Sequence, residues 1–226
     1  QALRMLLTTI ALGLNTRSIR GAGMPGQKAS EESRRMQILR AAYDVAARRG
    51  LDGLTVRLVA ERAHLSSGLV LFHFKAKEQL LIALLDYVLE TTTVLHVTED
   101  IARIALPLDR LIALLQREMN RLASEPKRIR MFFDFWAKGF RNPLIRSKMQ
   151  AELDRYREAF RPMAQEVLAA EPERFAHVTP EGLAAVAVSF IKGCAVQSMI
   201  DPNQFDIEEY LMAAQALVGQ LAPVSP

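Results

Sequence analysis

Apolar residues recur at steps of three and four along most of the chain from Ser30 onward, which is the spacing of one face of an α-helix. Ser30 or Ser33 has N-cap chemistry for a first helix that runs to Arg49, and Gly50 ends it. The apolar face of this helix is Ile38, Ala41, Ala42 and Val45. No segment alternates with a period of two between turn signals, so the pattern predicts no strand.

The next three helices are expected at Val56–Arg62, Ser66–Phe74 and Lys75–Leu95. Thr55 and Ser66 supply the N-caps of the two short helices, and the turn Ala63-His64-Leu65 separates them. Val70 and Phe74 lie four residues apart on one face of the second short helix, so we expect them to be buried.

Five further helices are predicted beyond residue 100, with Pro near their starts or breaks. They are approximately Leu108–Ser124, Lys127–Phe140, Pro143–Ala170, Pro180–Met199 and Phe205–Leu221. Pro162 is expected to kink the third of these. The sequence therefore predicts an all-α protein of about nine helices.

The first 30 residues interrupt this pattern. A short apolar run, Leu6 to Leu14, precedes a tract rich in Gly, Pro and Ser. Three interpretations compete, which are a secretory signal, a start-site artefact with Met24 as the natural start, and a flexible basic arm. Only Arg4 precedes the apolar run, which disfavours the signal, and we favour the artefact with a disordered tail.

Charge is distributed unevenly along the chain, whose net charge is +4. Residues 1–23 carry three Arg and no acid. Residues 24–96 carry ten Lys and Arg against eight Asp and Glu, and the remainder carries sixteen against seventeen. The basic N-terminal side fits contact with a polyanion.

Composition argues against several other classes of protein. Half of the 226 residues are hydrophobic, which is enough for a real core, and no apolar run approaches the roughly 18 residues of a membrane-spanning helix. The single cysteine, Cys194, and the lack of a Cys/His cluster fit a reducing cytoplasm and predict no metal and no cofactor. The four histidines lie in separate segments and no phosphate-binding Gly loop is present, so an enzyme is not expected.

The first three predicted helices have the layout of a helix-turn-helix domain, in which the second of two short helices enters the DNA major groove. The segment Arg34–Leu80 resembles the DNA-binding domain of the TetR family of transcriptional repressors. The matching positions are Ile38, Ala41, Ala42, Gly50, Thr55, Ala60, Ala63, Ser66, Gly68, His73, Phe74, Lys77, Glu78 and Leu80. The resemblance implies a three-helix DNA-binding domain at 31–78, followed at 79–222 by a helical bundle for effector binding and dimerisation.

Several matched residues have a physical role at a DNA backbone. Ser66 and Ser67 open the reading helix, where hydroxyls and backbone N–H groups reach a phosphate, and Gly68 lets that backbone approach closely. Lys77 is a candidate phosphate contact, and Arg57 contacts either phosphate or a guanine edge. The remaining candidates of the DNA interface are Thr55 and His73. In the alternative interpretation, Arg57 and Lys77 are ordinary solvated charges and His73 bonds a backbone carbonyl.

The chain departs from the family at three positions. Leu69 and Leu71 stand where Thr and Tyr are common and bond to phosphates, and His64 stands where Gly is usual in the turn. The loss of two hydroxyls weakens the hold on the backbone, since each such bond is worth roughly 1 kcal/mol. Leucine contacts thymine methyl groups, so our hypothesis is that Leu69 or Leu71 reads a step that contains T.

The last two predicted helices suit dimerisation, because two-fold operators are read by two-fold dimers. Their apolar stripes indicate a four-helix interface between subunits, as the resemblance also implies. The candidate interface residues are Phe190, Ile207, Tyr210, Leu211, Ala214, Leu217 and Val218. The alternative is that both helices cover the core of their own chain.

The segment Ile129–Pro143 is the most aromatic of the chain and is a candidate effector site. The overlapping segment Phe135–Gln150, together with Asp201–Leu211, resembles the BetI-like subgroup of the TetR family, which contains a choline-responsive repressor. The candidate effector-binding residues are Phe132, Phe133, Phe135, Trp136 and Phe140. For a quaternary ammonium effector, Trp136 with Phe132 or Phe135 would form a cage, with charge from Asp134. A helical aromatic stripe of this kind is more often core.

These observations favour a cytoplasmic, homodimeric, TetR-like repressor that binds a palindromic double-stranded DNA operator and is released by a small-molecule effector. A dimeric helical adaptor or ligand-binding protein that has lost DNA binding is the alternative. Steep salt dependence of operator affinity separates the two, because only phosphate contacts release counterions.

Overall fold

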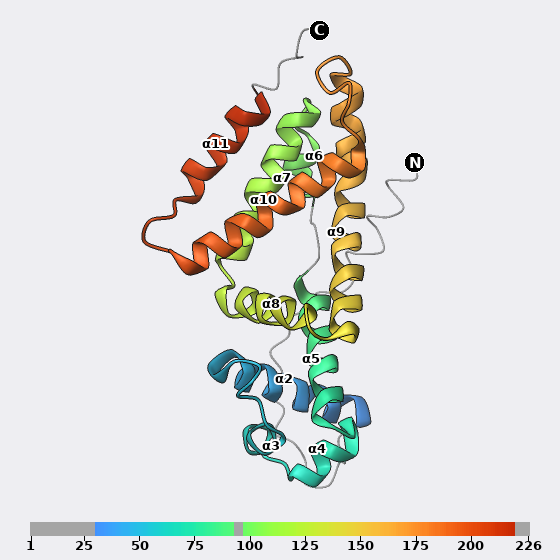
Figure 1. The fold of residues 1–226 in the computed structure, drawn as a ribbon, viewed down its shortest axis with the longest axis vertical. Coiled ribbons are helices and arrows are strands. Elements are labelled where there is room, and N and C mark those ends of the chain that lie inside the picture. Colours follow the sequence, from blue (N-terminus) through green and yellow to red (C-terminus); the bar gives the residue numbers. More distant parts are fainter. Residues whose placement is uncertain (1–29, 93–96, 220–226) are drawn as a thin grey trace. The chain divides into compact units, whose positions relative to one another are not determined.

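The computed structural model describes residues 30–92 and 97–219, and this part of the chain is entirely helical apart from its turns and loops. The helices are α2 (Glu31–Arg49), α3 (Val56–Ala63), α4 (Ser67–Phe74), α5 (Lys77–Thr92), α6 (Glu99–Ala102), α7 (Pro107–Ala123), α8 (Pro126–Gly139), α9 (Pro143–Ala170), α10 (Pro180–Ile200) and α11 (Ile207–Gly219) (Figure 1). The predicted all-α fold is confirmed. The described residues hold one helix more than the nine expected, because the single turn α6 is too short for a periodic pattern. The proposed N-terminal tail and Leu221 lie outside the described residues.

The turn between α3 and α4 is built by the side-chain caps that the sequence predicts. The Thr55 hydroxyl accepts a hydrogen bond from the Leu58 N–H at 3.2 Å, and the Ser66 hydroxyl accepts one from the Leu69 N–H at 3.1 Å. His64 ends α3 with a φ of 55°. This left-handed conformation favours Gly, so His64 takes it at a cost, and the backbone here explains why the turn usually carries Gly.

The long fourth helix starts two residues later than predicted. Lys75 has a φ of 59° and breaks the helical path after α4, so α5 begins at Lys77. Periodicity missed this break because the apolar residues on either side remain in a helical register.

A first hydrophobic core joins helices α2–α5 to the start of the C-terminal half. Val70 and Phe74 are buried in it as predicted, with exposed fractions of 0% and 2%. The same cluster contains Phe132 and Phe135 of α8 and buried residues from the first turns of α9. The helix α4 is therefore supported by a core that continues beyond α2–α5.

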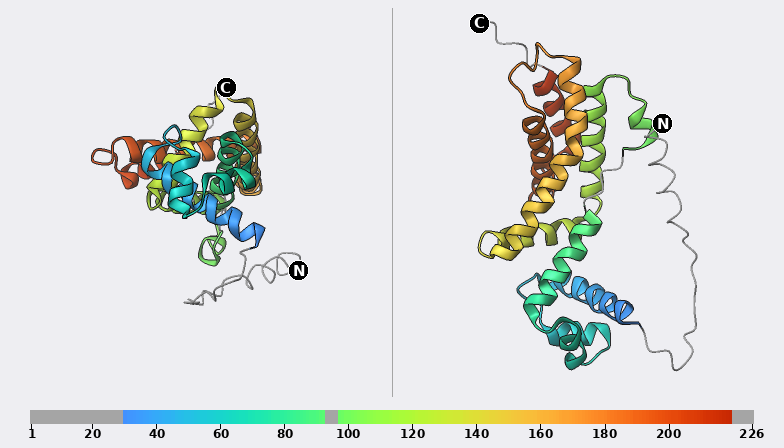
Figure 2. Two further views of the ribbon diagram at one scale, coloured as in Figure 1. Left: turned by 90° about the horizontal axis from the view of Figure 1, so that it is seen from below. Right: turned by 90° about the vertical axis from the view of Figure 1, so that its right-hand side faces the viewer.

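A second hydrophobic core lies between α7, the C-terminal half of α9 and α10, with a contribution from α11. The helix α9 is 28 residues long and continues through Pro162. In Figure 1, α10 crosses in front of α7 toward α9, and Figure 2 shows α7 and α9 side by side.

The helix α10 is the one described segment that is long and apolar enough to cross a membrane by length and composition. Only 33% of its apolar window is buried inside the chain. Core helices of water-soluble proteins pass the same test, and the buried side of α10 contains Ala184, Ala187, Ile191 and Cys194. The remaining apolar surface of α10 is thus open to a partner.

Candidate DNA interface and ligand site

The exposed side of α4 presents an apolar surface flanked by small and basic residues. Leu71 is 40% exposed, Phe72 is 64% exposed, and Leu69 is half-buried. Phe72 was not among the predicted contacts, although the helical period places it on the opposite side from the buried Val70. The Lys75 ammonium group lies over the Phe72 ring, 5.1 Å from its centroid. Of the two leucines, Leu71 is the more accessible to a base edge.

The start of α4 leaves room for close approach of another molecule. Ser66, Ser67 and Gly68 are all exposed. A Cβ added at Gly68 would meet only the Ser66 hydroxyl, at 3.9 Å, and Gly68 does not have a positive φ. Nothing in the folded chain therefore requires Gly at this position.

The predicted basic contacts differ in their environments. Arg57 is exposed and forms an ion pair with Glu61 at 3.1 Å, one turn further along α3. Lys77 is half-buried in the first turn of α5, where a cation opposes the helix dipole, so it gains no stability from its position. Thr55 is exposed beside Arg57.

His73 is held by its backbone rather than by its ring. Its carbonyl oxygen accepts a 2.6 Å hydrogen bond from Arg35, and its ring lies edge-on to Phe72. The Nδ1 atom is buried and has no hydrogen-bond partner among the described residues. Because this nitrogen is buried, it is not open to an external donor, and the predicted phosphate contact of His73 gains no support from it.

The five aromatic residues of the predicted effector site do not share one environment. Phe132 and Phe135 are fully buried, Phe133 and Trp136 are half-buried, and Phe140 is 69% exposed just after the end of α8. Trp136 lies 5.6 Å from Phe132 and 6.1 Å from Phe133, measured between ring centroids. None of these five aromatic residues lines any of three surface pockets of the chain. Burial of Phe132 and Phe135 agrees with the core interpretation of the stripe, whereas Phe140 stands apart because it lies beyond the end of α8; a role of the five in effector binding stays a prediction.

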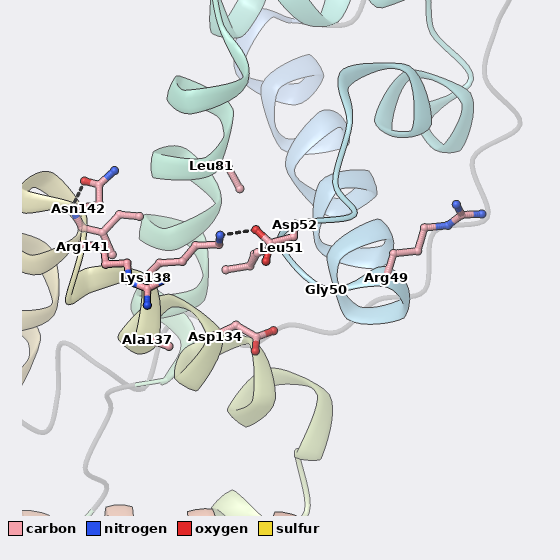
Figure 3. A pocket seen from close by; sticks show the side chains of 11 residues that line it. Arg49, Gly50, Leu51, Asp52, Leu81, Asp134, Ala137, Lys138, Arg141 and Asn142 are labelled. Atoms are coloured by element: carbon pink, nitrogen blue, oxygen red, sulfur yellow. Dashed lines mark hydrogen bonds and ion pairs between the residues drawn. The ribbon is translucent and has the colours of Figure 1, made fainter.

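One pocket of about 570 Å³ lies where the loop after α2 meets α8 and the start of α9 (Figure 3). Lys138 donates a 2.5 Å hydrogen bond to the exposed carboxylate of Asp52 across it. This bond, together with the charge of Lys138, lowers the pKa of Asp52. Asp134 also lines this pocket, and burial raises the pKa of its carboxyl group.

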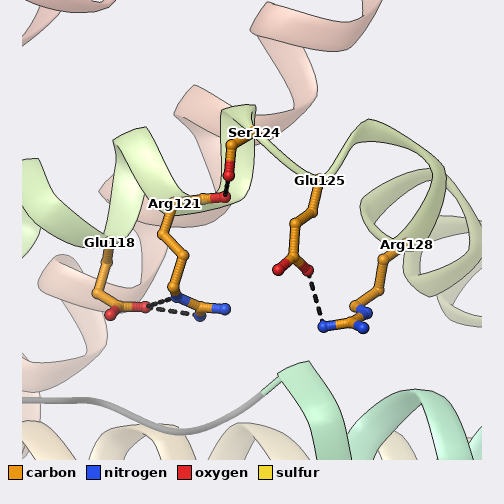
Figure 4. A network of polar contacts seen from close by, with 5 residues as sticks. All are labelled: Glu118, Arg121, Ser124, Glu125 and Arg128. Carbon is orange, nitrogen blue, oxygen red and sulfur yellow. Dashed lines mark hydrogen bonds and ion pairs between the residues drawn. The ribbon is translucent and has the colours of Figure 1, made fainter. Parts of the chain in front are cut away.

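A charged cluster that the sequence analysis did not find lies between α7, α9 and α10. Glu118 of α7 is 1% exposed and pairs with Arg121 at 2.7 Å (Figure 4). Glu152 of α9 is 4% exposed and pairs with Arg155 at 2.6 Å. Lys192 of α10 completes the cluster, with its ammonium group 4.2 Å from the centroid of Phe132 and 4.4 Å from that of Tyr156. A sequence signal existed, since Lys192 is a lone cation within an otherwise apolar stretch of α10.

Burial shifts the protonation equilibria of this cluster. Desolvation lowers the pKa of Lys192 to about 8, against the opposing effect of Glu152. It raises the pKa of Tyr156 to about 12 and raises that of Glu152, although Arg155 opposes the latter shift. At neutral pH the ammonium form of Lys192 still predominates, so the rings of Phe132 and Tyr156 already hold a cation.

The two C-terminal helices bury some of the predicted interface residues and expose others. Leu211 is buried in the chain's own core, and Tyr210 packs on Phe190, to whose carbonyl oxygen its hydroxyl donates at 3.2 Å. Ile207 and Ala214 are half-buried, Leu217 is exposed, and the side chain of Val218 lies outside the described residues. Val186, which is part of the apolar pattern of α10, is exposed. Further exposed apolar residues on these helices, which the sequence analysis did not single out, are Val196, Ile200 and Met212.

Family models match both the N-terminal and the C-terminal part of the chain. Residues 38–84 match the family of bacterial regulatory proteins called tetR. Residues 107–223, more than half of the chain, match the C-terminal part of BetI-type transcriptional repressors. The chain belongs to the TetR family. It is a transcriptional regulator with a BetI-like C-terminal half, as the sequence resemblance predicted.

Curated relatives of this TetR-family chain are transcriptional regulators named BetI, and they align with it over most of their length. The HTH-type transcriptional regulator BetI of Paraburkholderia phymatum is 26% identical over 191 residues, which cover 84% of this chain and 93% of the relative. The regulator of the same name from Stenotrophomonas maltophilia is 26% identical over 188 residues, covering 81% and 90%.

Solved structures share the fold at lower identity. A putative TetR-family regulator from Rhodococcus sp. superposes with a TM-score of 0.63 and 22% identity, covering 86% of this chain and all of that one. A putative regulator from Saccharomonospora viridis, solved in complex with choline, gives a TM-score of 0.64 and 17% identity, covering 84% and 97%.

Gly68 gives a test of the DNA interface in this TetR-family chain. We expect Gly68→Ala to raise the free energy of unfolding by about 0.5–1 kcal/mol, because the helix gains a better helix former and no clash arises. We expect the same variant to bind operator DNA several-fold more weakly, because the added methyl group lies where the phosphate backbone approaches. Urea unfolding and a DNA-binding titration measure the two effects. A stabilised variant with unchanged DNA affinity would show that no backbone contact is made at Gly68.

Proposed function

We propose that this regulator is a ligand-responsive repressor that binds a palindromic operator as a homodimer and is released by a small-molecule effector. The observation that carries the proposal is the exposed start of α4. There, Ser66 caps the helix, Gly68 leaves the backbone open, and Leu71 and Phe72 project from the helix without a packing partner in the core. The N-terminal end of a helix with free N–H groups suits a phosphate, and the apolar residues suit base edges.

The proposed DNA interface keeps the residues expected from the sequence and adds one. The set is Thr55, Arg57, Ser66, Ser67, Gly68, Leu69, Leu71, His73 and Lys77, together with Phe72. Residues 31–78 form the proposed reading domain, and residues 79–222 form the effector-binding and dimerisation domain. Arg57 must exchange its ion pair with Glu61 for a DNA contact, which costs little because the pair is exposed.

The effector acts in this proposal by changing the distance between the two reading helices of the dimer. A ligand that binds better to the wide-set state lowers operator affinity by its differential affinity for the two states and by no more than that. The core that α8 shares with α2–α5 supports such coupling, because a displacement of α8 has to repack the base of the reading domain.

An adaptor without DNA binding is the alternative function. Its supporting observation is the apolar reading surface, since Leu71 and Phe72 offer no hydrogen bond to DNA. The basic residues around α4 and the open Gly68 favour the repressor, because an adaptor has no use for either.

Salt dependence at Lys77 tests the repressor. We expect sequence-selective binding to DNA upstream of the chain's own gene, with affinity that falls steeply as salt rises. Lys77→Ala should weaken binding and lower the salt slope by about one, because one phosphate contact is lost. The matched control is Lys127→Ala, which removes an exposed lysine at the start of α8 and should change neither quantity. If the protein does not bind this DNA, or if its affinity does not change with salt, the adaptor function is favoured over the repressor.

Leu69 and Leu71 test how the operator is read. We expect the double variant Leu69→Thr/Leu71→Tyr to bind the phosphate backbone more tightly and to lose preference for T at one or more operator positions, because hydroxyls replace methyl-binding groups. Selection of bound sequences from a randomised DNA pool compares the two proteins. An unchanged base preference would reject a reading role for both leucines.

The exposed apolar side of α10 tests dimerisation. We expect Ile200→Asp to shift the chain from dimer to monomer, because Ile200 is 81% exposed and a carboxylate at a subunit interface would lose its hydration. Leu144→Asp, at an exposed apolar position of α9, should leave the dimer intact. Analytical ultracentrifugation reports the mass of each variant. A wild-type chain that is already monomeric would mean that α10 and α11 serve only their own core.

A further inference from the structure

The charged cluster of α7, α9 and α10 contains polar groups that the folded chain leaves unsatisfied. The Oε1 atom of Glu152, in a residue that is 4% exposed, is buried without a hydrogen-bond partner among the described residues. The hydroxyl of Tyr156, which is 1% exposed, is outside hydrogen-bond geometry too, although Arg121 lies close enough to oppose the rise in its pKa that burial causes. The ammonium group of Lys192 has cation–π contacts with two rings but no hydrogen bond or ion pair among the described residues. Buried polar groups are normally paired, so an unpaired buried oxygen on Glu152, close to an ammonium group that has only aromatic contacts, indicates a missing partner.

The charges of the cluster define that partner. Arg121, Arg155 and Lys192 face two carboxylates, those of Glu118 and Glu152, so the cluster carries one positive charge in excess. Each Arg is already paired with a Glu, and the excess charge therefore resides on Lys192. The carboxylate of a zwitterionic ligand would pair with Lys192, and its ammonium N–H would bond the free acceptor on Glu152, so that each charged end faces a group of opposite charge.

The aromatic rings disfavour a ligand that is only a cation. Lys192 already occupies the face of Phe132 and that of Tyr156. A choline-like molecule would have to displace this tethered ammonium group from both rings, or lie against it at the cost of like-charge repulsion.

An approach to the cluster exists at the surface of α9. Glu152 lines a pocket of about 370 Å³ together with Asp86 and Glu90 of α5 and Lys148, Ala151 and Arg155 of α9. This volume is in the range of small-molecule sites, and Glu152 is the residue that the pocket and the cluster share. Its Oε1 atom, Lys192 and Tyr156 lie behind the pocket lining, so a ligand has to displace part of that lining to reach them.

We propose that the charged cluster around Lys192 is the effector site of this regulator, and that it takes a small zwitterion of the amino-acid type rather than a quaternary ammonium alcohol. The ligand carboxylate binds Lys192, and its N–H donor binds Glu152, with the Tyr156 hydroxyl as a further partner. The inference rests on the proposed function for the consequence of binding, but the site and the ligand class are testable without DNA.

Three matched compounds distinguish the ligand classes in calorimetric titrations of the full chain. Choline has a trimethylammonium group and no carboxylate, glycine betaine has both, and N,N-dimethylglycine has a carboxylate and one N–H. We expect N,N-dimethylglycine to bind at least tenfold more tightly than choline, with glycine betaine between them. Choline binding as tight as that of N,N-dimethylglycine, or no binding of any of the three, overturns the assignment.

Variants of Lys192 locate the site. Lys192→Met should weaken N,N-dimethylglycine binding at least tenfold, and Tyr156→Phe should weaken it several-fold while keeping the ring. Lys192→Ala removes the tethered cation from the cage and should bind choline at least tenfold more tightly than the wild type does. Lys127→Met is the matched control and should bind like the wild type. Equal ligand affinities in wild type and Lys192→Met, with circular dichroism showing both folded, overturn the proposal.

Operator binding of the same preparations without ligand separates this inference from the proposed function. Selective DNA binding combined with silent titrations rejects the ligand site alone. Titrations that follow the expected order without any DNA binding reject the repressor and retain the site.

Discussion

The side chain of Phe132 packs in the first hydrophobic core and also contacts the charged cluster, so both depend on its position. It is fully buried in the core that α2–α5 share with α8, and the ammonium group of Lys192 lies 4.2 Å from its ring centroid. The reading domain and the charged cluster therefore meet at one residue. A ligand that draws Lys192 away from Phe132 removes a cation from the face of a ring that also supports the base of the reading domain. This contact gives the proposed signal a short physical route, although coupling itself requires two states that the ligand binds unequally.

The sequence predicted the reading domain closely because its information is local. Thr55 and Ser66 cap their own helices, and the burial of Val70 and Phe74 follows from their spacing alone. A cap and an i, i+4 pair are decided within a few residues, so no knowledge of distant segments is needed. The break at Lys75 escaped because a positive φ at a non-glycine residue has no composition signal.

The proposed ligand site could not be predicted in the same way, because it is assembled from residues far apart in the sequence. The aromatic stripe of α8 was correctly seen as helical, yet periodicity does not say which neighbouring helix covers which face. Phe132 therefore belongs to the core, Phe140 lies exposed beyond the helix end, and Leu211 faces its own chain. Glu118, Glu152 and Lys192 come from three helices, and only packing brings their charges together.

The presence of a charged cluster inside an otherwise apolar bundle is itself an argument for function. An apolar side chain in place of Lys192 would avoid the desolvation that lowers its pKa to about 8, and replacing buried ionic groups by apolar ones of similar volume is often neutral or stabilising. The surrounding core of Tyr156, Phe160 and Ile191 could accommodate such a residue, since all three are apolar or aromatic and fully buried. A protein that keeps unsatisfied polar atoms inside an apolar bundle gives up stability at that place. Sequences break the local rules of core packing chiefly where a ligand or a switch requires it, which is the reason for placing the proposed effector site at Lys192.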